Sequence, residues 1–138
     1  MKKKIYKPLV SVIMNCHNGE KYLIESISSL ITQSYKNWEL IFWDNNSTDN
    51  SKKIVIKFKD KRIKYFRSNK FNKLYHARNL AINKANGKYI GFLDVDDLWE
   101  KNKLKKQIEF FYVNKRIKVI YSNFFLIDEI KKKKKIRI

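Results

Sequence analysis

The chain has 138 residues, 43% of them hydrophobic and 14% aromatic, and its 32 lysines and arginines against 13 acidic residues give a net charge of +19. This length and composition fit one folded domain and argue against a disordered chain or a pair of domains. The single cysteine, Cys16, excludes an intramolecular disulfide and favours a reducing, cytoplasmic compartment, and no apolar run is long enough to span a bilayer.

Hydrophobic periodicity predicts strands and helices in alternation along the chain. In chain order we expect a strand at residues 9–14, a helix at 20–33, a strand at 38–43, a helix at 49–59, a strand at 63–67, a helix at 74–85, a strand at 89–94, a helix at 98–112 and a strand at 119–125. Strands that alternate with helices form βαβ units, so we expect an α/β domain with a parallel sheet. This domain covers residues 8–128, between a basic lead at 1–7 and a lysine-rich tail at 129–138.

Polar segments follow three of the expected strands, at residues 15–18, 44–49 and 94–97. Such residues often do no more than form turns. In an open parallel sheet, however, ligands bind in the crevice beyond the carboxyl ends of the strands. The joint placement of the three segments therefore predicts a single binding site at that edge of the sheet.

The third segment closes an apolar run with Asp94, Asp96 and Asp97. If the strand continues to Asp96, the carboxylates of Asp94 and Asp96 point to the same face. Paired carboxylates suit a divalent cation such as Mn²⁺ or Mg²⁺, which commonly carries a phosphate group with it. The alternative is that these acids only cap the helix expected at 98–112.

The positive charge raises two further classes of partner, nucleic acid and an anionic membrane surface. Most of the cations are lysines spread along the chain, and no aromatic and basic recognition motif stands out, so we expect no nucleic acid partner. The lysines at 131–135 could contact anionic lipid at the cytoplasmic face of the membrane, or form a solvated tail.

Five segments in sequence resemble the family 2 glycosyltransferases, over about residues 8–127. They are VSVIMNCHN at 10–18, QSYKNWELI at 33–41, DNNSTD at 44–49, ARN at 77–79, and GKYI at 87–90 leading into DVDD at 94–97. The resemblance implies a GT-A (Rossmann-like) fold and a nucleotide-diphosphate sugar as ligand, with a UDP-sugar favoured. By the same analogy Asn15 and His17 line the nucleotide pocket, and Asp44 accepts hydrogen bonds from the base.

The resemblance also assigns the diphosphate end of the site. Arg78 would lie near the pyrophosphate, although it could equally be a surface cation of its helix. Asp94 would contact the ribose, and Asp96 would hold the Mn²⁺ or Mg²⁺ ion that bridges the diphosphate. We assign Asp97 no ligand and expect it only to cap the following helix.

Members of this family transfer a sugar, with inversion, to a glycan, polysaccharide or lipid-linked acceptor. That reaction needs a general base for the acceptor hydroxyl, which the resemblance places in a second half, beyond residue 138. Asp128 and Glu129 follow Asp96 too closely to match it, so we expect a donor-binding half of the fold and name no catalytic residue. The alternatives are a non-catalytic nucleotide-sugar-binding module, an inactive truncated glycosyltransferase, and a basic protein that binds nucleic acid or a membrane surface.

Some positions depart from the family pattern. Asn15 and His17 stand where a proline and a tyrosine are usual, and Asn46 replaces a glycine. Because asparagine tolerates the left-handed backbone conformation, we expect the turn at Asn46 to survive.

Overall fold

The computed structural model describes residues 7–128 and 133–137. Strands and helices alternate along most of the chain, as the sequence predicts. In chain order they are β1 (Val10–Cys16), α1 (Leu23–Ile31), β2 (Trp38–Asp44), α2 (Ser51–Lys57), β3 (Ile63–Arg67), α3 (Leu74–Ile82), β4 (Tyr89–Phe92), α4 (Lys103–Val113), β5 (Phe124–Asp128) and β6 (Lys133–Arg137).

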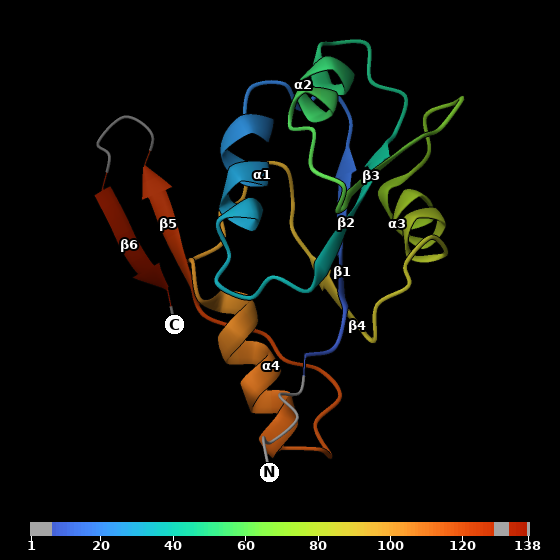
Figure 1. Cartoon of the computed structure of the whole chain (residues 1–138). Coiled ribbons are helices and arrows are strands. Elements are labelled where there is room, and N and C mark those ends of the chain that lie inside the picture. The colour runs from blue at the N-terminus through green and yellow to red at the C-terminus, as the bar shows by residue number, and fades with distance from the viewer. Residues whose placement is uncertain (1–6, 129–132, 138) are drawn as a thin grey trace.

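The first four strands form one parallel sheet in the order β3-β2-β1-β4 (Figure 1). The last two strands pair antiparallel in a separate hairpin. In the parallel sheet β1 lies between β2 and β4, with Cys16 opposite Asp44 and Ile13 opposite Phe92. The carboxyl ends of the strands therefore share one edge, and the α/β parallel-sheet prediction is confirmed.

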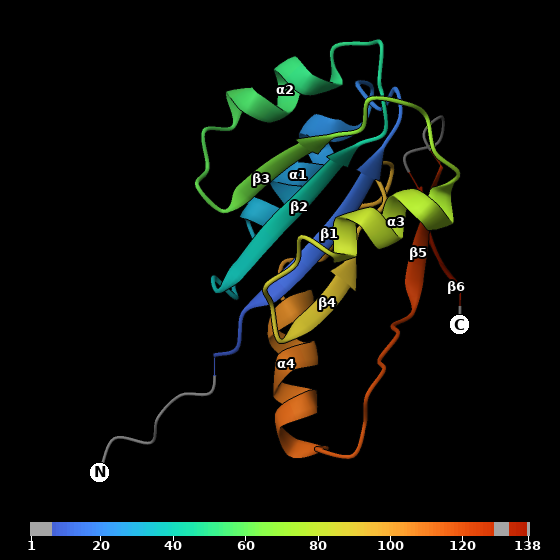
Figure 2. The ribbon, with the colours of Figure 1, turned by 90° about the vertical axis from the view of Figure 1, so that its right-hand side faces the viewer.

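Helices cover both faces of the sheet (Figure 2). The larger core lies on the face covered by α1, α2 and α4, where Leu23, Ile27 and Leu30 of α1 repeat at the spacing of one helix face. On the opposite face α3 packs through Ala77 and Ala81. Both are small side chains, so this helix can approach the strands closely.

Three expected boundaries are wrong. The fourth strand ends at Phe92, and a turn follows in which the backbone N–H of Asp97 donates to the carbonyl of Asp94 at 3.1 Å. Asp94 and Asp96 thus do not lie on one extended strand. Helix α4 starts at Lys103 with Asn102 at its N-cap, so the acids do not cap it. The strand expected at 119–125 is β5, which begins only at Phe124.

A buried polar network joins the amino ends of the strands, away from the carboxyl edge. Glu39 is 4% exposed and accepts hydrogen bonds from Ser11 Oγ at 2.6 Å, the backbone N–H of Asn86 at 2.7 Å and Lys64 Nζ at 2.5 Å. Although burial alone would raise the pKa of Glu39, the hydrogen bonds from these groups lower it. Gly87 N–H donates to Ser11 Oγ at 2.7 Å, so the network ties β1, β2, β3 and the segment before β4 together.

In the described part of the chain, no helix has both the length and the apolar character needed to cross a membrane. Strand β6 occupies residues 133–137 of the lysine-rich tail. Residues 1–6, 129–132 and 138 lie outside the described residues, and so does most of the basic lead.

Candidate functional site

The three polar segments predicted to converge do meet at the carboxyl edge of the sheet. Asn18 N–H donates to Ser47 Oγ at 3.0 Å, and Thr48 N–H donates to Asn18 Oδ1 at 2.8 Å. A Cβ built on Gly19 would lie 3.5 Å from Val95 Cβ and 2.8 Å from Cys16 Sγ. The loop after β1 is therefore bonded to the loop after β2, and its Gly19 lies close to Val95 of the acidic turn after β4.

Asp44 organises the loop after β2. Its side chain is fully buried, Oδ1 accepts the backbone N–H of Ser47 at 2.7 Å, and Oδ2 accepts Arg67 Nη1 at 3.0 Å as well as the Tyr65 hydroxyl. Asn46 in this loop has a φ of 63°, so the expected left-handed turn is confirmed. As the molecule stands, the Asp44 carboxylate is enclosed by these donors, and direct contact with a nucleobase would require Arg67 to move.

Sequence reasoning did not identify Tyr65 and Arg67 as part of the site. Both lie on β3, where they read as ordinary strand residues, and Arg67 is paired in register with Asp44. Burial, together with the hydrogen bond to Asp44, raises the pKa of the Tyr65 phenol to about 12. Arg67 also donates from Nη2 to the Ser47 carbonyl at 2.9 Å and to Asn46 Oδ1 at 3.3 Å, so it closes the loop from outside.

The two predicted pocket residues after β1 have different surroundings. His17 is exposed, and its Nδ1 lies 3.0 Å from the Asn45 carbonyl, which can only accept, so Nδ1 carries the proton. The amide oxygen and nitrogen of Asn15 are buried and have no hydrogen-bond partner among the described residues. Buried polar atoms are normally satisfied, so the Asn15 amide has spare hydrogen-bonding capacity beside the site.

Arg78 and Asp94, predicted to share the site, are in direct contact. Arg78 Nη2 donates to Asp94 Oδ1 at 2.8 Å, and the guanidinium lies 5.4 Å from the centre of the Phe92 ring. The side chains are 33% and 55% exposed. The pair thus places a cation and an anion together, open to solvent, between α3 and the acidic turn.

The acidic turn could contribute carboxylates to a divalent ion, although it does not form a complete cage. In residues 7–128 and 133–137 no three His, Cys, Asp or Glu side chains are grouped to hold a metal by themselves. Asp96 is exposed. Desolvation raises the pKa of Asp97, and the negative charges of Asp96 and Asp94 raise it further. A cation would relieve this repulsion, and Mg²⁺-type ions commonly take one or two carboxylates plus phosphate oxygens.

Cys16 is a buried residue that packs against the loops of the candidate site. The thiol is 1% exposed and lies 3.5 Å from Ser51 Oγ and 4.0 Å from Ser47 Oγ. Ser51 Oγ in turn accepts the backbone N–H of Gly19 at 3.1 Å. Burial raises the pKa of the Cys16 thiol, so this residue is a packing group and not a nucleophile.

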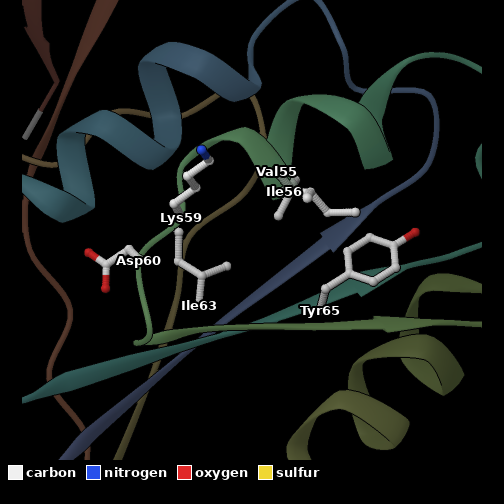
Figure 3. A pocket seen from close by; sticks show the side chains of 6 residues that line it. All are labelled: Val55, Ile56, Lys59, Asp60, Ile63 and Tyr65. Carbon is white, nitrogen blue, oxygen red and sulfur yellow. The ribbon is translucent and has the colours of Figure 1, made fainter.

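A hollow of about 190 Å³ lies elsewhere, between α2 and β3 (Figure 3). Its lining consists of Val55, Ile56, Lys59, Asp60, Ile63 and Tyr65. It shares only Tyr65 with the polar cluster at the carboxyl edge, and none of the predicted site residues lines it. The candidate site therefore lies at the carboxyl edge of the sheet and not in this hollow.

Comparison with known proteins agrees with this geometry. The model of the family "Glycosyl transferase family 2" matches residues 11–137. The chain is 42% identical, over 120 residues, to the UDP-Glc:alpha-D-GlcNAc-diphosphoundecaprenol beta-1,3-glucosyltransferase WfgD of Escherichia coli, covering 87% of this chain and 47% of that protein. It thus spans about half the length of this relative.

Solved structures show the same fold. Residues 1–349 of S. aureus TarS in complex with UDP superpose with a TM-score of 0.72 at 31% identity, over 75% of this chain and 32% of that 1–349 chain. The mannosyltransferase PcManGT of Pyrobaculum calidifontis, in complex with GDP-Man and Mn²⁺, has a TM-score of 0.72 at 23% identity, over 78% of this chain and 33% of that one; this likeness concerns the fold alone. The matched family, the GT-A fold and the site at the carboxyl edge agree, and the chain belongs to glycosyltransferase family 2.

Proposed function

We propose that this chain binds a nucleotide-diphosphate sugar, with a UDP-sugar as favoured donor, and takes part in transferring the sugar with inversion to a glycan, polysaccharide or lipid-linked acceptor. The observation that carries the proposal is the meeting of the three polar segments at the carboxyl edge, with the Arg78–Asp94 pair beside Asp96. The E. coli relative is named for a UDP-Glc donor and a diphosphoundecaprenol-linked acceptor, and the TarS structure contains UDP.

The nucleoside end of the donor is assigned to the loops after β1 and β2. His17 is exposed there with a fixed ring orientation, and the Asn15 amide has hydrogen-bonding capacity that the described residues leave unused. Asp44 holds the loop after β2 in place and positions Arg67, whose side chain is 39% exposed. Asp44 would bind the base directly once Arg67 has moved aside, or indirectly by holding Arg67 in place to contact the base.

The diphosphate end is assigned to Arg78, Asp94 and Asp96. Arg78 supplies cationic N–H donors suited to phosphate oxygens, and Asp94 would exchange its bond with Arg78 for the ribose hydroxyls. Asp96 would hold Mn²⁺ or Mg²⁺, which stabilises the negative charge on the departing nucleoside diphosphate. No general base is assigned in this chain.

We also propose a cytoplasmic location with peripheral contact at an anionic membrane. Residues 110–127 include Lys115, Arg116 and Lys118 and no acidic residue. Exposed apolar side chains lie between and beyond these cations, among them Val113 at 77% and Val119 at 80%. Basic residues near an anionic surface contribute about 1 kcal/mol each, and an acceptor carried on lipid would be found at such a surface.

Calorimetric titration with UDP and then GDP, each with and without Mn²⁺, tests the donor site. We expect binding of one nucleotide that requires the metal ion. Hydrolysis or transfer from the matching nucleotide sugar would show an enzyme, whereas binding without turnover would show a binding module. Affinity for DNA or RNA that falls steeply with salt, with no nucleotide binding, would refute the proposal in favour of a nucleic-acid-binding protein.

A further inference from the structure

The segment between β3 and α3 presents an aromatic side chain to solvent beside the candidate site. Phe71 in this segment is 59% exposed. Its ring meets the ring of His17, from the loop after β1, with centroids 4.7 Å apart and planes at 66°. This edge-to-face pair joins two loops that are far apart in the sequence.

Hydrogen bonds fix the His17 ring and the backbone next to Phe71. The Asn45 carbonyl holds His17 Nδ1, and the Asn45 side chain donates to the Asn72 carbonyl at 2.8 Å and accepts the Asn72 N–H at 3.0 Å. Asn72 Nδ2 also donates to Ser68 Oγ at 2.8 Å. Asn72, directly after Phe71, is therefore hydrogen-bonded to both Asn45 and Ser68, so the backbone that carries the Phe71 ring is held in place.

The pair stands next to the Asp44 loop. Ser68 N–H donates to the Asp44 carbonyl at 2.8 Å, and Asn45 N–H donates to the Cys16 carbonyl at 2.7 Å. The segment that carries Phe71 is thus connected to the carboxyl ends of β1 and β2. A large apolar ring that is both held and exposed at such a place is suited to cover a flat ligand.

We propose that the Phe71 ring, positioned by its edge-to-face contact with His17, is the aromatic platform on which the base of the bound nucleotide stacks. This inference rests on the proposed function, which supplies the nucleotide. Stacking of a base on an aromatic side chain contributes about 1–3 kcal/mol and tolerates different bases, because every base has a π face. The platform accordingly adds affinity for the nucleoside part and leaves the choice of base to hydrogen-bonding groups.

Two substitutions separate stacking from simple packing. Phe71→Leu keeps apolar bulk beside His17 and removes the π face, and Phe71→Trp enlarges the π face. Stacking predicts that UDP affinity in the presence of Mn²⁺ falls about 5- to 100-fold in Phe71→Leu and is retained in Phe71→Trp. Affinity for pyrophosphate with Mn²⁺, which lacks a base, should be the same in all three proteins.

Phe110→Ala is the matched control, because Phe110 is 48% exposed and lies on α4, away from the carboxyl ends of the strands (Figure 2). This variant should bind UDP as the unmodified chain does. If the unmodified chain binds UDP and Phe71→Leu binds it equally well, the platform is refuted and the proposed function stands. If pyrophosphate affinity falls along with UDP affinity, Phe71 acts by holding the loops and the platform is again refuted. If the unmodified chain binds neither UDP nor GDP, the proposed function fails and this inference fails with it.

Discussion

Arg67 and Asp44 face each other at the last paired position of β2 and β3, with the guanidinium Nη1 3.0 Å from the carboxylate Oδ2. Asp44 is 0% exposed and Arg67 is 39% exposed, so the pair connects the interior of the sheet to the surface. The other bonds of Arg67 go to Ser47 and Asn46. One side chain therefore neutralises a buried acid and closes the loop that follows it.

Replacement of Arg67 by methionine should destabilise the fold. The buried Asp44 carboxylate would keep its bonds from Tyr65 and Ser47 and would lose its cation, which is expected to lower the free energy of unfolding by about 1–3 kcal/mol. Urea denaturation measures this change. Lys105→Met is the control, because the Lys105–Glu109 pair is exposed and 4.0 Å long. Equal stability of the two variants would show that Arg67 is not needed to compensate Asp44.

Replacement of Asp96 by asparagine should abolish metal-dependent nucleotide binding and leave the melting temperature unchanged or slightly higher. The substitution removes an exposed charge that repels Asp97. Calorimetry with UDP and Mn²⁺, alongside a thermal melt, gives both readings, with Glu109→Gln on α4 as the control. A variant that binds UDP with undiminished dependence on Mn²⁺ would remove Asp96 from the metal site.

Replacement of Arg78 by alanine should affect binding much more than stability. The Arg78–Asp94 pair is open to solvent, and such pairs contribute no more than about 1 kcal/mol to folding. Loss of the guanidinium should nevertheless weaken binding of UDP and of pyrophosphate together, since both carry the phosphates it is proposed to contact. If only the melting temperature changes, Arg78 is a structural surface residue.

Replacement of Gly87 by alanine should destabilise the amino end of the sheet. The added Cβ would lie 2.4 Å from the backbone nitrogen of Ser11 and 2.7 Å from its Oγ, which is bonded to the buried Glu39. Overpacking of this kind costs about 1–3 kcal/mol. Gly91→Ala is the control, because its Cβ would come no closer than 3.1 Å, to the Trp99 ring. Similar melting temperatures for the two variants would contradict the predicted clash.

Stability should fall as the pH rises from about 10 to about 12, in part through Tyr65. Its pKa is raised from 10.0 to about 12 in the folded chain, so in this window the unfolded chain releases the proton while the folded chain keeps it. A group with a raised folded pKa favours folding below its unfolded pKa and loses that contribution through the window, by up to about 1.4 kcal/mol per pH unit. Denaturation at several pH values should give a shallower decline for Tyr65→Phe, and identical slopes would contradict the shift.

The alternation of strands and helices could be predicted because the buried positions of α1 repeat at helical spacing, whereas β1 is a short, almost continuously buried run. The prediction failed between residues 93 and 102 for a physical reason. Leu93 lies beyond the end of β4 and is still 1% exposed. The apolar run in the sequence therefore continues past the strand and made the strand look longer than it is. The Trp99 side chain packs against the larger core, and the backbone N–H of Trp99 donates to Ser29 Oγ at 3.1 Å. This tertiary contact belongs to a loop, whereas apolar spacing alone suggested a helix.

The candidate site was predicted in part. The convergence of the three polar segments followed from strand order, and their loops lie together in the structure. The contact between Arg78 and Asp94 was not predicted, and the ligand roles that the resemblance gives these two residues stay predictions. Tyr65 and Arg67 were missed because their spacing is that of any strand residue. Their signal lies in the register of β3 against β2, which pairs Arg67 with Asp44 and which a single sequence does not reveal.

The burial of Cys16 makes the chain convenient for spectroscopic work. Its thiol is enclosed, its pKa is raised, and it is the one cysteine in the sequence. In the native state it should react slowly with thiol reagents, so a cysteine introduced on the surface can be coupled to a fluorophore without altering the native one. Cys16 becomes accessible only when the loops around it open, so the slow rate at which it is modified in the folded chain reports how often those loops open.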